Sequence, residues 1–130
     1  MTKRDVLYVL GDAAFTMDSV ESFKEIHGEK ILVRGNHDTL NTSVYLKYFK
    51  EVYGLLKYKG MWLSHAPIHP QELRNRVSVH GHVHYDSVRV SDSDQIDSRY
   101  FNMCVENLMG KFGSPIINLT QLQKWITSKQ

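Results

Sequence analysis

The stretch Lys30–Asp38 (KILVRGNHD) decides the fold of this chain of 130 residues. A short apolar run with branched side chains ends at Gly35, and polar side chains follow directly. Such a run is typical of a buried strand, and a glycine at its end lets the chain turn sharply. The stretch therefore predicts a strand that presents Asn36, His37 and Asp38 in the turn behind it.

Three other predicted strands end in the same way. With the polar residues that follow them, they are Asp5–Leu10 before Asp12, Met61–Ser64 before His65, and Val77–Val79 before His82 and His84. Ligands of open α/β sheets bind in the loops beyond the carboxyl ends of the strands. We therefore expect the four strand ends to converge on one site.

The residue types at these strand ends suit a divalent metal. Asp, Asn and His supply oxygen and nitrogen ligands, which favour Mn, Fe, Zn or Ni. One residue separates His82 from His84, so an extended backbone would place both imidazoles on the same side. Each motif alone is commonly a turn or a structural histidine. Four of them in order, each behind a strand, predict a metal site.

The rest of the pattern predicts helices early in the chain and strands later. Helices are expected from the capping box Asp18/Glu21 to Gly28, from about Thr42, and from the capping box Thr120/Gln123. Further strands are expected at Tyr53–Tyr58, where a hairpin turn at Lys59-Gly60 follows, at Ser87–Val90 and at Tyr100–Val105. The order β-α-β-α and then mostly β predicts an α/β fold with a mixed sheet covered by helices.

Composition places the chain among ordinary globular proteins. Hydrophobic residues make up 42% and charged residues 23%, which suits a single domain over residues 1–130. The net charge of +2 lacks the basic excess of a dedicated nucleic-acid-binding module. The single cysteine, Cys104, is interpreted as a buried, inert thiol in the middle of a strand. No apolar run suggests a membrane span or a signal peptide, so we expect a cytoplasmic protein.

The polar blocks resemble those of the calcineurin-like metallophosphoesterases. That family has an Asp-x-His, a Gly-Asp, a Gly-Asn-His-Asp/Glu, a lone His and a Gly-His-x-His. The sequence resembles the second to fifth blocks in order, and it is most similar to small bacterial and phage members. Further likeness lies in Lys3–Val6 and Pro115–Leu119. The resemblance implies a four-layer α/β/β/α sandwich with mixed sheets and a two-metal centre, in the cytoplasm of a bacterium or of a phage-infected host.

The resemblance also implies a metal-binding role for five residues. Asp12 would bridge the two metals. Asn36, His65 and His82 would complete the shell of the second metal, and His84 would bind the first.

Two residues would act without binding metal. His37 would face the phosphate beside Asn36, as a proton donor to the leaving oxygen or as a stabiliser of developing charge. Asp38 would orient His37 and keep it cationic.

The family's first block has no counterpart before Asp12. The resemblance therefore implies that the first β-α unit is missing, together with two ligands of the first metal. We expect one bound metal, with the second position weak or empty. The chain would be a fragment, a natural short form or a pseudoenzyme. A homodimer would cover the sheet edge that the missing strand leaves open.

Two functions follow from the resemblance. The first is hydrolysis of a phosphomonoester or phosphodiester by metal-activated water, with nucleic acid entering only as a substrate. The alternative is a degenerate member that binds a metal or a partner without catalysis. The retained His37 favours the hydrolase, because a purely structural metal site would not need it.

Overall fold

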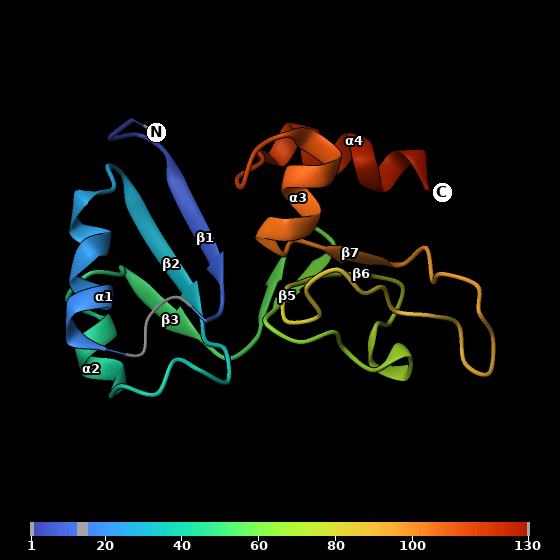
Figure 1. Ribbon diagram of the computed structural model, residues 1–130, viewed down its shortest axis with the longest axis horizontal. Coiled ribbons are helices and arrows are strands. Elements are labelled where there is room, and N and C mark those ends of the chain that lie inside the picture. Colours follow the sequence, from blue (N-terminus) through green and yellow to red (C-terminus); the bar gives the residue numbers. More distant parts are fainter. Residues whose placement is uncertain (1, 13–15, 130) are drawn as a thin grey trace. The chain divides into compact units, whose positions relative to one another are not determined.

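The structure is a computed structural model that describes residues 2–12 and 16–129. The chain divides into two compact units, and each is described by itself. The first comprises Met1–Leu56 with Leu63–His65, and the second comprises Lys57–Trp62 with Ala66–Gln130. Helices and strands occur in both units (Figure 1), which confirms the predicted α/β class.

The first unit is built on a parallel sheet of three strands. They are β1 (Val6–Leu10), β2 (Glu29–Val33) and β3 (Glu51–Tyr53), in the order β1-β2-β3. β1 and β2 pair from Val6↔Glu29 to Leu10↔Val33, so their carboxyl ends stop at the same level. Both strands were predicted from their apolar runs, and the side-by-side ends bring their following turns together.

The third strand corrects one prediction. The strand expected at Tyr53–Tyr58 does not form as one piece, because Tyr53 ends β3 beside β2. The chain bends at Gly54 and Leu55, and a separate strand, β4 (Leu56–Tyr58), follows in another sheet. An apolar run shows that a strand can form, but only tertiary pairing decides where it is divided.

Helices cover one face of the parallel sheet, and the apolar core of this unit lies on that face. α1 (Met17–Glu21), the 3-10 helix η1 (Ser22–Glu25) and α2 (Thr42–Tyr45) are short, and α1 and α2 lie on the same side of the sheet (Figure 1). The fully buried cluster consists of Val20, Leu32, Tyr45 and Phe49. The predicted capping box at Asp18 and Glu21 is wrong, because Thr16 caps α1 together with Ser19.

The second sheet has the order β4-β5-β6-β7. The further strands are β5 (Met61–Ser64), β6 (Val77–His80) and β7 (Tyr100–Asn102), and β6 and β7 run parallel. Lys59 and Gly60 both have positive φ, 48° and 79°, between the neighbouring strands β4 and β5. Two-residue hairpin turns of type I′ need this combination, so the predicted hairpin is confirmed.

Two helices follow β7 in the second unit. The strand predicted at Tyr100–Val105 ends at Asn102, and α3 (Val105–Phe112) begins where it was expected to continue. Cys104 is the partly exposed residue before α3, so its placement as a buried residue in the middle of a strand is wrong. α4 (Leu119–Ser128) begins two residues earlier than predicted.

The start of α4 shows that capping residues that lie close together in the sequence compete to begin the same helix. The capping box that opens this helix is formed by Asn118 and Gln121, rather than by Thr120 and Gln123. The ring of Trp125 on α4 packs edge-on against Phe101 of β7 and Phe112 of α3, at centroid distances of 5.0 and 5.7 Å. Asn118 therefore begins a helix whose apolar side is set by these ring contacts.

The segment between β6 and β7 is mostly irregular. Before it, the 3-10 helix η2 (Pro70–Glu72) separates β5 from β6. The strand expected at Ser87–Val90 is reduced to one bridge between Arg89 and Ile96. Asp97 is buried and accepts hydrogen bonds from Arg99, which lowers the pKa of its carboxyl. No helix in the described part of the chain is long and apolar enough to cross a membrane.

Candidate metal centre

Three of the four predicted strand ends come together in the first unit. Asp12 follows β1, Asn36 follows β2, and His65 follows β5. Nε2 of His65 lies 2.9 Å from Oδ1 of Asn36 and 3.3 Å from Oδ2 of Asp12. Three donor atoms predicted to bind one metal thus face one another, although Asn36 and His65 are 29 residues apart in the sequence.

Two glycines allow this close approach. Gly11 has φ 86°, and a Cβ added there would stand 2.6 Å from Cγ of His65. A Cβ at Gly35 would stand 2.5 Å from the backbone nitrogen of Asp12. Real Cβ atoms essentially never come this close to other heavy atoms, so a side chain at either position would displace a predicted ligand.

The ring of His65 is held with Nε2 toward the two oxygens. Its Nδ1 lies 3.0 Å from the backbone carbonyl oxygen of Leu10, which can only accept a hydrogen bond. A neutral imidazole has one N–H, so a ring that donates from Nδ1 presents the Nε2 lone pair to Asn36 and Asp12. Turning the Asn36 amide would relieve one of these contacts, but the Asp12 carboxylate offers no hydrogen. A metal cation among the three donors would satisfy the arrangement.

The spacing of the three donors fits the shell of a metal. Ligands at about 2.1 Å from a metal stand about 3.0 Å apart at right angles and about 3.4 Å apart in a tetrahedron. The 2.9 and 3.3 Å separations lie close to these values. Within residues 2–12 and 16–129, no group of three or more His, Cys, Asp or Glu could hold a metal. The cluster is compatible with this absence, because it contains only two residues of these types and its third donor is the amide oxygen of Asn36. Donors of these kinds suit Mn, Fe, Zn or Ni.

The turn of residues 35–38 is tied to the same cluster. The backbone N–H of His37 donates to Oδ1 of Asp12 at 2.9 Å, so each oxygen of that carboxylate has its own neighbour. Asp38 is buried, and its Oδ2 accepts the N–H of Gly35 at 2.9 Å. Asp38 therefore closes the turn that carries Asn36 and His37. Its predicted role in orienting the His37 ring stays a prediction.

Arg34, which is not among the predicted site residues, supports this turn from behind. Its guanidinium donates to the carbonyl oxygens of Asp38 and Leu40, and it donates to Oγ1 of Thr42 at 2.8 Å. It also lies 5.1 Å from the ring centre of buried Tyr45, whose hydroxyl accepts the N–H of Leu40. An arginine directly before the Gly-Asn-His-Asp block was the only signal in the sequence.

We expect Arg34→Ala to loosen the segment of residues 38–42. The loss leaves partly buried carbonyls without their donor, at a cost of about 1–3 kcal/mol in the free energy of unfolding. Lysine cannot supply the planar fork of donors, so Arg34→Lys should recover less than half. Urea unfolding and amide hydrogen exchange measure both effects. Lys50→Ala, which breaks an exposed pair with Glu29, is the control; an equal loss there would contradict the role of Arg34.

The fourth strand end, behind β6, lies in the second unit. The prediction that an extended backbone aligns His82 and His84 is wrong, because these residues have φ values of 71° and 56°. The backbone N–H of Val83 donates to the carbonyl oxygen of Gly81, and that of Asp86 donates to the carbonyl oxygen of Val83. Two tight turns therefore replace the strand, since histidine is among the residues that adopt left-handed backbone more often than most.

His84 has a carboxylate partner. Its Nδ1 lies 2.6 Å from Oε2 of Glu106, in the first turn of α3. The pKa of the Glu106 carboxyl lies below its usual value, because its own backbone N–H and the His84 ring hydrogen-bond to it. Sequence reasoning missed Glu106, since α3 itself was not predicted.

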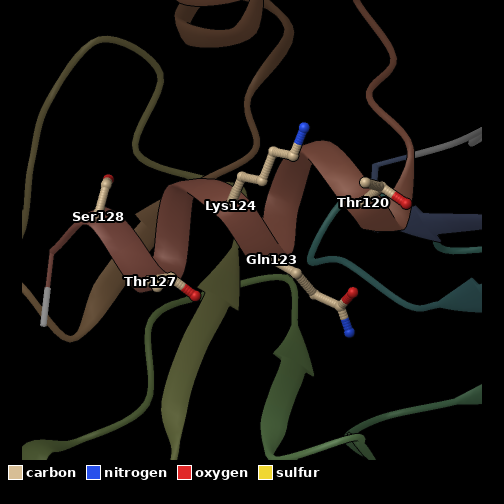
Figure 2. Close-up of a pocket in the computed structure, with 5 residues that line it drawn as sticks. All are labelled: Thr120, Gln123, Lys124, Thr127 and Ser128. Atoms are coloured by element: carbon tan, nitrogen blue, oxygen red, sulfur yellow. The ribbon is translucent and has the colours of Figure 1, made fainter.

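A hollow beside α4 has a different character. It is lined by Thr120, Gln123, Lys124, Thr127 and Ser128, all from one helix (Figure 2). Lys124 is the only charged side chain among them, and no carboxylate or imidazole lines the hollow. Its chemistry therefore does not match that of the strand ends.

Comparison with known proteins bears on the fold. The chain resembles the crystal structure of a protein of unknown function from Aquifex aeolicus, with 27% sequence identity and a TM-score of 0.56. The likeness covers 78% of this chain and 67% of the other. No family model matches the sequence, and no curated protein matches it. The likeness thus supports a shared α/β architecture.

Proposed function

We propose that the protein is a calcineurin-like metallophosphoesterase that hydrolyses a phosphomonoester or phosphodiester with metal-activated water. The observation that carries the proposal is the meeting of Asp12, Asn36 and His65 at three strand ends. These are three of the five ligands that the family resemblance implies. The proposal includes the four-layer α/β/β/α sandwich over residues 1–130, and His82 and His84 as the remaining ligands.

A bound metal would lower the pKa of a water molecule and neutralise charge on the phosphate. Asp12, Asn36 and His65 would hold it, with the carbonyl of Leu10 keeping Nδ1 of His65 protonated and Nε2 available. Asp12 also holds the backbone of His37 through Oδ1. Asp12, the negatively charged member of the proposed ligands, therefore also fixes the backbone of His37, the residue proposed to act on the substrate.

His37 is proposed to face the scissile phosphate beside Asn36. Both residues are exposed in the turn behind β2, while Asp38, which follows them, is buried. This arrangement leaves His37 accessible to a substrate on a turn closed by the Asp38 carboxylate. His37 would donate a proton to the leaving oxygen or stabilise the charge that develops there.

Hydrolysis of bis(p-nitrophenyl) phosphate with added Mn²⁺ tests the proposal. We expect metal-dependent turnover that falls about 10²–10⁴-fold in His37→Ala, the usual contribution of a positioned acid or base. His27→Ala, at an exposed histidine of the same unit, is the matched control and should keep full activity. Turnover no higher in the wild type than in His37→Ala would contradict the proposal.

The alternative is a degenerate member that binds metal or a partner without catalysis. Mn²⁺ binding with no turnover in the same assay would favour it. A homodimer that covers the β1 edge of the parallel sheet belongs to either version. β1 is an edge strand of that sheet, and Val6 on it is an exposed apolar residue.

A further inference from the structure

The turn that carries His82 and His84 is held by residues of the β7–α3 junction. Asn102, at the end of β7, is buried, and its side-chain amide donates to the carbonyl oxygens of His84 at 2.7 Å and Asp86 at 3.1 Å. Its Oδ1 accepts the N–H of Cys104 at 2.9 Å. One side chain therefore links this turn to the residue that directly precedes α3.

Asparagine suits this place because its amide offers two donors and an acceptor in one plane. His84 has left-handed backbone, with φ 56°, which costs free energy for a residue with a Cβ. Two hydrogen bonds, to the carbonyl oxygen of His84 itself and to that of Asp86 two residues later, stabilise the conformation. An aspartate of the same shape would place a carboxylate against those two carbonyl oxygens.

Four residues further along, Glu106 meets the ring of the same histidine. Its Oε2 lies 2.6 Å from Nδ1 of His84, while the His84 side chain is 77% exposed and that of Glu106 is 31% exposed. An exposed pair of this kind contributes little to stability, about 0–1 kcal/mol. Its effect lies elsewhere: a ring that donates from Nδ1 to a carboxylate leaves its Nε2 lone pair available to a ligand.

We propose that Asn102 and Glu106 are positioning residues for His84, with Asn102 holding its backbone and Glu106 selecting Nε2 as the metal-binding nitrogen. The metal-binding part of this inference rests on the proposed function. The positioning part concerns the protein without metal, and it can be measured there.

The tautomer of His84 tests the role of Glu106. Long-range ¹H–¹⁵N spectra of the metal-free protein, at a pH where the ring is neutral, should show the hydrogen on Nδ1. Glu106→Gln keeps an acceptor oxygen of similar reach and should keep this tautomer. Glu106→Ala should shift the ring toward the Nε2–H form. An unchanged tautomer in Glu106→Ala, or an Nε2–H ring in the wild type, would overturn the proposal.

Mn²⁺ titration of the same variants connects the tautomer to the metal. We expect affinity to fall about 10–100-fold in Glu106→Ala, as for other residues that orient a metal-bound histidine, and to fall less in Glu106→Gln. Equal affinity of the wild type and Glu106→Ala would overturn the metal-binding part. If the wild type binds no Mn²⁺ at all, the proposed function fails, while the tautomer still decides the role of Glu106.

Amide hydrogen exchange in residues 82–86 tests the role of Asn102. Asn102→Asp should speed exchange there at least about 10-fold, which corresponds to about 1.4 kcal/mol, a typical cost of a lost buried donor. Asn75→Asp, at an exposed residue of the same unit, is the matched control. Asn102→Ser keeps one donor and provides a milder variant if the aspartate prevents folding. Exchange unchanged in a folded Asn102 variant would contradict this role.

Discussion

Replacing Asp12 with alanine is expected to abolish tight Mn²⁺ binding, and with it any metal-dependent hydrolysis. The carboxylate is the one negatively charged donor of the three that meet, and its Oδ2 lies 3.3 Å from Nε2 of His65. Removing a residue that merely orients a ligand weakens metal affinity about 10–100-fold, so losing a ligand should exceed that range. Isothermal titration with Mn²⁺ measures the affinity, and the aryl phosphodiester assay measures turnover.

Two further variants separate charge from structure at this position. Asp12→Asn keeps the size of the side chain and an acceptor for the N–H of His37, but removes the charge. We expect it to stay folded and to bind Mn²⁺ weakly. Asp18→Ala, at an exposed aspartate in the first turn of α1, is the control and should bind like the wild type. Wild-type affinity in Asp12→Ala would show that no metal binds at this cluster.

The second large effect is expected from the glycines beneath the cluster. An alanine at Gly11 would strain left-handed backbone by about 1–2 kcal/mol and would press against the ring of His65. An alanine at Gly35 would press against Asp12, and overpacking of this kind costs about 1–3 kcal/mol. Because each added methyl displaces a proposed ligand, both variants should lose Mn²⁺ affinity as well as stability in urea.

The chain offers a matched control for each glycine. Gly60 shares the left-handed backbone of Gly11, with φ 79°, but has nothing within 4 Å of an added Cβ. Gly60→Ala should therefore show the loss of stability alone. Gly54, which also has open space around it, is the control for Gly35. If Gly11→Ala and Gly35→Ala bind Mn²⁺ as well as these controls, the close packing has no part in metal binding.

The local sequence pattern predicted the strands that lead to the cluster well, and it predicted the helices poorly. β1, β2 and the turn at Lys59-Gly60 were predicted because apolar runs and turn residues act over a few positions. The starts of α1 and α4 were misplaced, because several capping residues stand close together in each segment. The start of α3 was missed, since Cys104 gives no capping signal and the run after Asn102 also suits a strand.

The sequence by itself determined which types of metal-binding side chain follow the strands. Asp12, Asn36 and His65 each follow an apolar run, and the type and order of such residues can be read without knowing where the chain goes. Only the tertiary structure decided that these three side chains meet, that the carbonyl of Leu10 turns Nε2 of His65 inward, and that Glu106 faces His84. The contact between Leu10 and His65 joins residues 55 positions apart, and the contact between His84 and Glu106 joins residues 22 positions apart. No local preference of the backbone encodes them, because they arise only when strands and helices pack.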